Sequence, residues 1–567
     1  MNAERLLQHY ERIADAPDAI ARLRRFILDL AVRGKLVPQD PNDEPASELL
    51  KRIAKEKVRL VKAGEIRTPK AIAVQSEAPF PIPSNWRWSQ LAEIGVLSPR
   101  NEAPDTLEAS FVPMPMIAAE YGVANQHEVR SWGEIRKGYT HFAEGDVGLA
   151  KITPCFENGK SAVFRNLTGG IGAGTTELHI VRPLFVEQDF ILLFLKSPHF
   201  IETGIPKMTG TAGQKRVPTE YFAHSPFPLP PLAEQHRIVA KVDELMGLCD
   251  RLEAARAGRE AVRDRLAAAS LARLNAPDAE TFQADARFAL DALPGLTTRP
   301  DQIKRLRQTI LNLAVRGKLV PQDPNDEPAS ELLKRIAKEK ARLVKAGEFR
   351  KPKALPEVEE PPFDLPQNWR WTPIREVTSD RGQEIPQSTF TYIDVTAIDK
   401  EAGVVADPKV LEASEAPSRA RKITRKGDVI YSCVRPYLLN VAVIETDFDP
   451  PPIASTAFAI LNGHGLVMPR FIWIVLRSPF MVACVEENQR GQAYPAINDA
   501  DFAVLPFPLP PLAEQHRLVA KVDELMGLCD RLEASLNAAA ATRRRLLEAL
   551  LAEAFAPVDA RELEATE

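Results

Sequence analysis

The sequence predicts an α+β fold with two mostly β globules and two long helices, because its main features occur twice. Residues 227–254 return at 507–534 with a single change. Residues 20–70 return at 303–353 with 44 of 51 residues identical. The intervals between these blocks are nearly equal in length but differ in sequence. The chain therefore consists of two copies of one long unit.

The bulk composition indicates several domains and no strongly charged partner surface. A chain of 567 residues exceeds one domain core, and a net charge of −4 with a pI near 6.2 does not by itself indicate nucleic-acid binding. Residues 20–70 hold 13 Lys/Arg against 7 Asp/Glu. This excess suits a polyanionic partner or, more commonly, a solvated helix face.

The cysteines and apolar runs predict an ordinary cytoplasmic environment. The five cysteines lie far apart and lack the paired spacing of a zinc site or a disulfide framework. No apolar run is long enough for a membrane span, and the N-terminus has no signal-like apolar region. We therefore expect a cytoplasmic protein with no membrane partner.

Each half begins with two predicted helices. Asp18 precedes apolar residues at helical spacing, and Gly34 follows where a helix often ends, so a short capped helix is expected between them. Residues 46–63 place apolar side chains among Lys and Arg and stop before Gly64. This pattern predicts an amphipathic helix.

The two divergent intervals predict mostly β globules of one fold. Residues 79–227 and 362–507 carry short apolar or β-branched runs broken by Gly, Pro and Asn. An Asn-Trp-Arg-Trp motif occurs in both, at 85–88 and 368–371. These tryptophans suit base stacking or, more commonly, the core. The globules thus share a framework and differ in what they present.

A Leu-Pro-Leu-Pro-Pro sequence leads into a long helix in each half. Prolines suit an extended lead and a first helical turn but not a helix interior. After Pro231, apolar residues fall three or four apart, a spacing that packs against another helix. About 38 residues of helix would span roughly 57 Å. The two helices pack together as a rigid spacer, or each is buried singly within its own globule.

Motifs that would carry catalysis are missing from the sequence. Gly159-Lys160-Ser161 ends like a phosphate loop, but Pro154 replaces the required glycine, which favours a turn. Asp449 starts an Asp-Pro-Pro-Pro run that resembles an amino-methyltransferase motif without its stacking aromatic. No metal spacing or nucleophile elbow occurs. A recognition role is favoured over the alternative of an enzyme with a cryptic active site.

Four stretches carry a family resemblance. They are Pro-Leu-Pro-Pro-Leu-Ala-Glu-Gln-His-Arg at Pro228 and again at Pro508, GDVGLAKITPCFENGK at 145–160, GTTELHIVRP at 174–183, and GQKRVP at 213–218. On these stretches the chain resembles the specificity subunit, HsdS, of type I restriction-modification systems. The resemblance covers nearly the whole length.

The resemblance implies two target-recognition domains separated by an antiparallel coiled coil of the two long repeated helices, with pseudo-twofold symmetry. Each domain is then expected to recognise one half of a bipartite, asymmetric site in double-stranded DNA, and the helices to set the gap between the halves. A non-enzymatic two-domain protein-interaction scaffold is the alternative.

The resemblance also implies partner subunits. They are two modification subunits, which use S-adenosylmethionine to methylate adenine, and restriction subunits, which use ATP and Mg²⁺ to cleave DNA. No catalytic residue, bound metal or cofactor is expected in this chain.

The expected domain organisation has seven segments. They are an N-terminal helical repeat (1–78), target-recognition domain 1 (79–227), spacer helix 1 (228–275), a linker (276–300), a second helical repeat (301–361), target-recognition domain 2 (362–507), and spacer helix 2 with a tail (508–567).

Polar, glycine-punctuated stretches supply the candidate DNA-binding residues, although ordinary exposed loops would look similar. Arg, Lys, Asn and Gln can pair with base edges, and Ser, Thr and Tyr can contact bases or phosphates. The candidates are Lys151, Thr153, Asn158, Lys160, Lys207, Thr209, Thr211, Gln214, Lys215 and Arg216 in the first domain, and Arg435, Tyr437, Asn440, Gln489, Arg490, Gln492 and Tyr494 in the second.

The two recognition domains are not basic. Residues 79–227 hold 13 Lys/Arg against 15 Asp/Glu, and residues 362–507 hold 14 against 18. Contacts to phosphates usually require clustered positive charge. We therefore expect charge to be segregated on each domain, and partner subunits to supply much of the phosphate binding.

Overall fold

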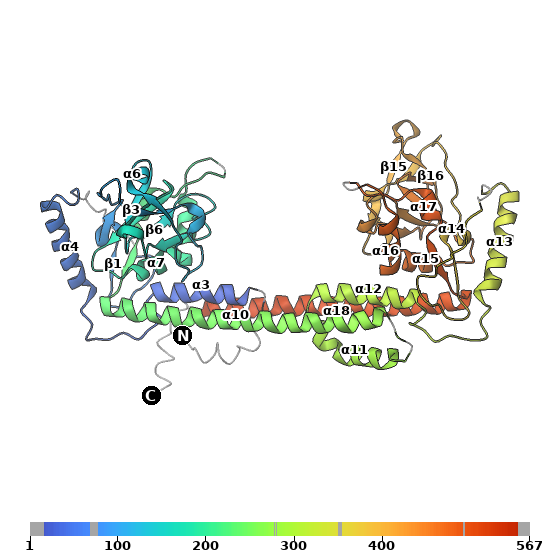
Figure 1. The fold of residues 1–567 in the computed structure, drawn as a ribbon, viewed down its shortest axis with the longest axis horizontal. Coiled ribbons are helices and arrows are strands. Elements are labelled where there is room, and N and C mark those ends of the chain that lie inside the picture. Colours follow the sequence, from blue (N-terminus) through green and yellow to red (C-terminus); the bar gives the residue numbers. More distant parts are fainter. Residues whose placement is uncertain are drawn as a thin grey trace. The chain divides into compact units, whose positions relative to one another are not determined.

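The computed structural model describes residues 16–553 except 17, 69–77, 212, 277, 279, 350–353, 492 and 493. The chain forms two compact units: unit 1 is Met1–Gly258 with Thr542–Glu567, and unit 2 is Arg259–Ala541. Each unit holds one strand-rich domain and several helices (Figure 1). The predicted α+β fold, with two strand-rich domains and two long repeated helices, is confirmed.

Domain 1, the strand-rich part of unit 1, consists of two four-stranded sheets and a two-stranded sheet with the orders β2-β9-β6-β7, β4-β3-β8-β5 and β1-β10. Its strands are β1 (Arg87–Ser89), β2 (Gly95–Leu97), β3 (Glu108–Val112), β4 (Glu128–Ser131), β5 (Thr140–Ala143), β6 (Val147–Ala150), β7 (Ser161–Val163), β8 (Ile171–Gly174), β9 (Leu178–Pro183) and β10 (Phe227–Leu229). The α-helices of unit 1 are α3 (Ala19–Val32), α4 (Ala46–Lys62), α5 (Leu91–Ile94), α6 (Trp132–Ile135), α7 (Gln188–Lys196), α8 (Pro198–Gly204), α9 (Thr219–His224) and the first part of α10 (Leu232–Asn275).

Domain 2, the strand-rich part of unit 2, has sheets with the orders β15-β12-β19-β16, β13-β14-β18-β17-β20 and β11-β21. Its strands are β11 (Arg370–Pro373), β12 (Phe390–Ile393), β13 (Ile398–Asp399), β14 (Val404–Val405), β15 (Lys409–Leu411), β16 (Ala420–Ile423), β17 (Val429–Ser432), β18 (Val441–Val443), β19 (Pro452–Ser455), β20 (Phe458–Leu461) and β21 (Pro506–Leu509). The α-helices are α11 (Phe282–Leu296), α12 (Pro300–Val315), α13 (Ala329–Lys345), α14 (Ile374–Val377), α15 (Pro469–Arg477), α16 (Pro479–Asn488), α17 (Asp499–Ala503) and most of α18 (Leu512–Glu553).

The two domains repeat one strand pairing despite their different sequences. The parallel pair β3–β8 corresponds to β12–β19, and the antiparallel pair β6–β9 corresponds to β17–β20. A short helix lies at the core of each domain, α7 or α15, and most of its residues are buried. Burial on several sides explains the run of six consecutive apolar residues at the centre of each helix, Phe190–Leu195 and Phe471–Leu476.

The first predicted helices are present with the expected ends. Helix α3 stops before Gly34, whose φ of 66° is the left-handed conformation that glycine adopts without a steric penalty. The Lys35 N–H then donates to the Leu30 carbonyl at 3.0 Å, as in a glycine-closed helix end. Asp18 stands at the predicted N-cap position, but its side chain makes no capping hydrogen bond.

Buried polar side chains fix the start of each long helix to its domain. The Gln235 side chain accepts the N–H of Glu187, just before α7, at 2.8 Å, and donates to the Pro230 carbonyl at 2.9 Å. Gln515 in unit 2 binds Met468 and Pro510 in the same way. Both glutamines are fully buried. The Glu-Gln pair of the repeated motif is therefore a structural joint.

The neighbouring glutamates complete this joint. Glu514 accepts hydrogen bonds from the Trp369 indole at 2.9 Å and from Gln322 at 2.6 Å. Burial raises the pKa of Glu514, and the two donors oppose this shift. Glu234 occupies the same position in unit 1 and accepts from Gln39 at 2.7 Å. One helical turn thus joins the long helix to a core tryptophan and to the loop before α13.

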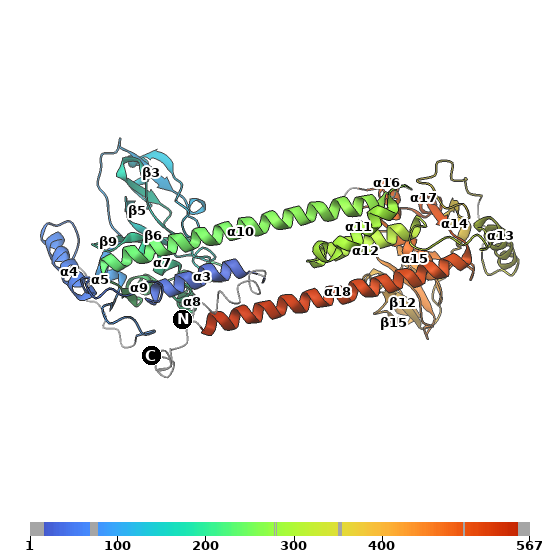
Figure 2. The same ribbon diagram turned by 90° about the horizontal axis from the view of Figure 1, so that it is seen from below.

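In unit 2 the two long helices run in opposite directions along α12 (Figure 2). Helices α12 and α10 are parallel here, because Arg299 pairs with Glu260 and, further along both helices, Asn312 donates to the Asn275 carbonyl. Contacts to α18 run the other way: Arg307 binds Glu533, whereas Gln322, beyond α12, binds Glu514 near the start of α18. Each long-helix segment therefore packs on the short helix.

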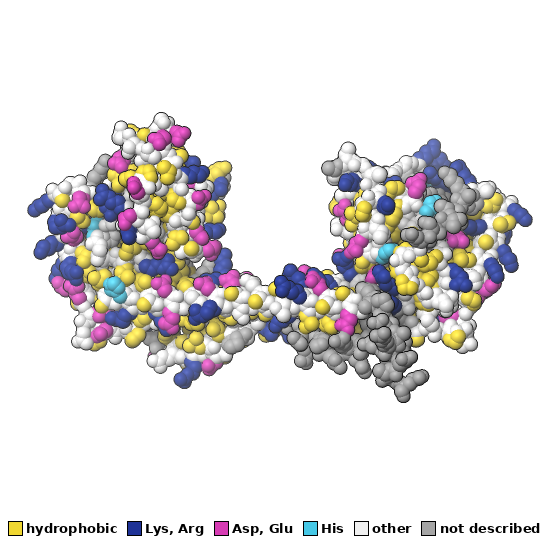
Figure 3. All heavy atoms as spheres, turned by 180° about the vertical axis from the view of Figure 1, so that it is seen from behind, with side chains coloured by type: hydrophobic (Ala, Val, Ile, Leu, Met, Phe, Trp, Pro, Cys, Tyr) yellow, Lys and Arg dark blue, Asp and Glu magenta, His cyan; other side chains and the backbone are white. Residues whose placement is uncertain are grey.

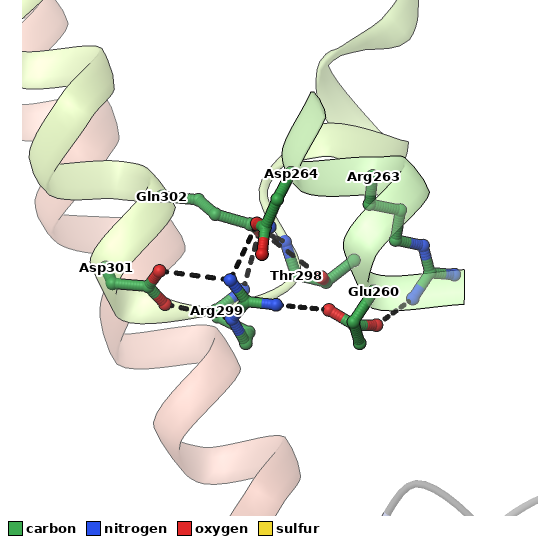
Figure 4. A network of polar contacts seen from close by, with 7 residues as sticks. All are labelled: Glu260, Arg263, Asp264, Thr298, Arg299, Asp301 and Gln302. Atoms are coloured by element: carbon green, nitrogen blue, oxygen red, sulfur yellow. Dashed lines mark hydrogen bonds and ion pairs between the residues drawn. The ribbon is translucent and has the colours of Figure 1, made fainter. Parts of the chain in front are cut away.

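Arg299 ties the start of α12 to α10 (Figure 4). Its guanidinium forms ion pairs with Glu260, with Asp264 at 2.7 Å and with Asp301 at 3.0 Å. These carboxylates raise the pKa of the guanidinium. The equivalent residue in the first repeat is Ala16, which packs against apolar side chains of α18. The two units therefore hold equivalent helices by different interactions.

Two details of the helices differ from the sequence prediction. Helix α10 has 44 residues, against about 38 expected, because no helix-breaking residue stops it before Ala276. The interval 276–300, expected as a linker, contains the 15-residue helix α11. Apolar residues of α11 such as Ala289 and Leu296 are buried, so packing in the unit stabilises this segment as a helix.

Replacing Glu514 tests the joint between helix and domain. Glu514→Ala should lower the free energy of unfolding by about 2–4 kcal/mol, because the Trp369 and Gln322 donors lose their acceptor in the interior. Glu514→Gln should cost less, since an amide oxygen still accepts. Urea titration followed by tryptophan fluorescence measures both values, with His516→Ala, an exposed neighbour, as the control. Equal stability of the Ala variant and the parent would contradict this role.

Candidate nucleic-acid interface

A tight hairpin in domain 1, together with Lys207 just before it, carries six of the ten predicted site residues of that domain. Thr209 and Arg216 exchange two backbone hydrogen bonds, of 3.0 and 2.8 Å. Gly210 has a φ of 125°, and Gly213 has a φ of 80°, which permits the reversal between them. The predicted residues of this stretch are exposed; they are Lys207, Thr209, Thr211, Gln214, Lys215 and Arg216.

The hairpin is attached to the segment that follows β6. The Thr153 N–H donates to the Lys215 carbonyl at 2.9 Å, and the Val217 N–H donates to the Lys151 carbonyl at 2.8 Å. Lys151 and Thr153 are therefore adjacent to the hairpin, although they lie about 60 residues away in sequence.

Asn158 and Lys160 lie on a separate turn. Asn158 is exposed, and the Lys160 ammonium donates to the Met114 carbonyl at 3.3 Å. The buried Lys196 ammonium holds this turn by donating to the Gly159 carbonyl at 3.0 Å. Among the described residues, no hydrogen bond or ion pair joins these two side chains to the hairpin. The predicted turn at Gly159-Lys160-Ser161 is present only in part, because Gly159 ends a turn and Ser161 already begins β7.

Domain 2 repeats the same backbone arrangement. Arg490 and Ala496 exchange hydrogen bonds of 2.8 and 2.9 Å, and Gly491 between them has a φ of 90°. The Arg435 N–H donates to the Pro495 carbonyl at 2.8 Å, just as Thr153 does to Lys215. Gln492, another predicted site residue, lies outside the described residues. The hairpins of the two domains therefore stand on equivalent scaffolds.

The remaining candidates of domain 2 differ in exposure. Tyr494 is 70 % exposed and Tyr437 is 51 % exposed, so both present aromatic rings to solvent. Asn440 is only 8 % exposed, and the Gln489 side-chain oxygen is buried. The two aromatic rings and Arg490 thus form the exposed part of this site, and Arg435 is half-buried beside them.

Two carboxylates that the sequence analysis did not single out hold arginines of the hairpins. Glu177 binds Arg216 through both oxygens, at 2.8 and 2.9 Å, and this interaction lowers the pKa of Glu177. Asp501 binds Arg490 at 3.0 Å. Glu177 lies within the stretch 174–183 that carries the family resemblance, but only the fold brings it to Arg216.

The core interpretation of the tryptophans is confirmed for the first of each pair. Trp86 and Trp369 are 1 % exposed. Trp88 and Trp371 are partly buried and lie edge-on to Phe80 and Phe363, with ring centroids 5.0 and 4.9 Å apart. Cys249 and Cys529 are also buried, as predicted.

Charges are mixed on the visible surface of each domain. On the face shown in Figure 3, Lys and Arg lie among Asp and Glu on both strand-rich domains. Among the described residues, no cluster of His, Cys, Asp and Glu could hold a metal ion. Within the same ranges, no helix combines the length and apolar character of a membrane span.

The chain therefore belongs to the class of proteins with two domains of one fold, and each domain presents a polar hairpin with different side chains on an equivalent scaffold. No protein-family model matches the chain. Two curated relatives from Escherichia coli cover nearly all of it: the type I restriction enzyme EcoAI specificity subunit is 40% identical over 94% of this chain and 93% of the relative, and the EcoEI specificity subunit is 40% identical over the same shares. The chain belongs to the family of type I restriction enzyme specificity subunits.

A solved structure is also similar. The HsdS subunit from Thermoanaerobacter tengcongensis covers 85% of this chain and 99% of its own, with 21% sequence identity and a TM-score of 0.44.

A substitution at Gly210 tests the hairpin geometry. A Cβ atom there would lie 2.9 Å from the Gln214 carbonyl, and the φ of 125° strains any L side chain. Gly210→Ala should therefore open the hairpin locally, at a cost of about 1–3 kcal/mol. Hydrogen exchange of the Thr209 and Arg216 amides should accelerate, whereas Gly258→Ala, in an open position of α10, should leave it unchanged. Unchanged exchange in the Gly210 variant would contradict this geometry.

Proposed function

We propose that this chain is the sequence-specific DNA-recognition subunit of a type I restriction-modification complex. Domain 1, within residues 79–227, recognises one half of a bipartite, asymmetric site, and domain 2, within residues 362–507, recognises the other. The observation that carries the proposal is the pair of equivalent hairpins with unlike side chains. Such a pair can present two different surfaces to two different half-sites.

The spacer in this proposal consists of the repeated helices in residues 228–275 and 508–567. Helical segments with a fixed joint to each domain hold recognition surfaces at a set separation, as in proteins that bind two spaced half-sites. The glutamine and glutamate joints support this role, because they attach each domain to its helix through buried hydrogen bonds.

Catalysis belongs to partner subunits in this proposal. Two modification subunits supply S-adenosylmethionine-dependent methylation of adenine, and restriction subunits supply cleavage that depends on ATP and Mg²⁺. In this proposal the chain recognises the DNA sequence and binds no cofactor itself. It acts on DNA in the cytoplasm. The small excess of Asp and Glu over Lys and Arg in each domain sequence supports a contribution of the partners to phosphate binding.

The candidate residues divide into two groups within this proposal. The exposed hairpin side chains, among them Gln214, Lys215 and Arg490, contact the DNA directly. Glu177 and Asp501 orient the arginines that they bind. Lys160 and Asn440, which are partly or largely buried, support the loops on which their neighbours stand.

Exchanging domain 1 tests the modular function. Residues 79–227 are replaced by those of another family member, and adenine methylation is profiled in the DNA of cells that hold the complete system. One half of the methylated motif should change, while the other half and the gap remain. Exchange of residues 362–507 is the matched experiment and should change the opposite half.

Other results would contradict the proposal in different ways. A change of both halves by one exchange would exclude independent recognition domains. The absence of any bipartite methylated motif with the unmodified chain would favour the protein-interaction scaffold instead.

A further inference from the structure

Both hairpin scaffolds have an equivalent position, occupied by a different residue in each domain. Thr153 and Arg435 both donate their backbone N–H to the hairpin, at 2.9 Å to Lys215 and 2.8 Å to Pro495. This hydrogen bond places both residues beside the hairpin of their domain. A side chain at this position can change without removing the hydrogen bond that fixes it.

Arg435 is held in an unusual backbone conformation. Its φ is 48°, in the left-handed region that is sterically unfavourable for a residue with a Cβ atom. The bond to Pro495 and a second one, from the Leu438 N–H to the Arg435 carbonyl at 3.0 Å, maintain this conformation. Such strain in a non-glycine residue is concentrated at functional sites.

The side chain of Arg435 is oriented by an aromatic ring. Its guanidinium carbon lies 4.8 Å from the centroid of Tyr494. An arginine stacked on a ring is restricted in rotation and still keeps its N–H groups free at the edge of the plane. Tyr494 is 70 % exposed and Arg435 is half-buried, so the ring lies at the surface and the guanidinium is partly accessible beside it.

Arg435 also differs from the two hairpin arginines in its ion pairing. Arg216 and Arg490 are paired with Glu177 and Asp501. Arg435 forms no ion pair with any carboxylate in the described part of the chain. It therefore combines a fixed guanidinium plane with an unneutralised charge and unoccupied donors.

We infer that Arg435 recognises a guanine in the major groove of the half-site bound by domain 2. The planar fork of a guanidinium matches the O6 and N7 acceptors of guanine, which no other base presents together. Tyr494 is a positioning residue that acts through Arg435. This inference rests on the proposed function and adds to it the base and the side chain that recognises it.

Methylation profiling tests the inference in cells with the complete system. Arg435→Gln should make one guanine position of the methylated motif degenerate, in the half that also changes when residues 362–507 are exchanged. The other half should stay the same. Lys409→Gln removes a positive charge from an exposed position of domain 2 and should leave the motif unchanged.

Binding to modified duplexes identifies the contacted atoms. The assembled methylation complex is titrated with the wild-type motif and with the same duplex carrying 7-deazaguanine at the implicated position, which lacks only the N7 acceptor. Binding of the parent complex should weaken at least about fivefold, within the roughly 5- to 150-fold range of one bidentate base contact. The complex with Arg435→Gln should bind both duplexes equally.

Conservative variants separate positioning from folding. Tyr494→Phe keeps the ring and should retain the guanine preference. Tyr494→Leu removes the ring and should relax the preference at the same position as Arg435→Gln. If Tyr494→Leu also lowers the melting temperature, the Phe variant and the duplex experiment remain decisive.

Several results would overturn the inference and leave the proposed function intact. One is an unchanged motif with Arg435→Gln. Another is an equal loss of binding to all duplexes, which identifies a phosphate contact. A parent chain that gives no bipartite motif would instead overturn the proposed function itself.

Discussion

The fold of each unit depends on hydrogen bonds made by one turn of the long helix, inside the protein. Gln235 and Gln515 accept the backbone N–H immediately before the core helix of their domain, and Glu234 and Glu514 bind side chains from the loop after the first short helix. Buried polar groups lose a large free energy when a partner is removed, so they favour a single geometry. The angle between helix and domain is therefore set by this turn, and the two units share it because they share the motif.

The same logic separates what the repeats preserve from what the domains vary. Polar groups that lie in the interior, such as Gln515 and Glu514, are surrounded by fixed partners, and a substitution there affects the whole joint. Side chains at the hairpins face solvent, where a substitution costs little stability. Arg216 and Arg490 illustrate this freedom. Each forms an ion pair with a carboxylate, and the two carboxylates lie on non-equivalent segments of the two domains. Divergence in the two intervals is thus compatible with one fold.

Local sequence patterns predicted much of the architecture, but they did not predict the contacts between residues far apart in the sequence. The spacing of apolar residues and the glycine at position 34 identified α3 and its end, and proline placement identified the start of α10. Helix α11 was missed because tertiary packing, rather than a strong local pattern, stabilises it. The pairing of Arg216 with Glu177 joins residues 39 positions apart and requires the sheet to bring them together. The hairpins were located from glycine and polar residues, but the burial of Asn440 was not evident from sequence.

The scaffold beneath the hairpins explains how recognition can change while the fold does not. Thr153 and Arg435 are each held by a hydrogen bond from the backbone N–H to a backbone carbonyl. Any residue other than proline has this donor. The ring of Tyr494 and the charge of Arg435 are added by side chains alone. A domain built in this way accepts threonine at one copy and a stacked arginine at the other with the same strand pairing beneath. The constraint lies in the backbone and the chemistry lies in the side chain. In the proposed function, each copy can therefore acquire its own base preference independently of the other.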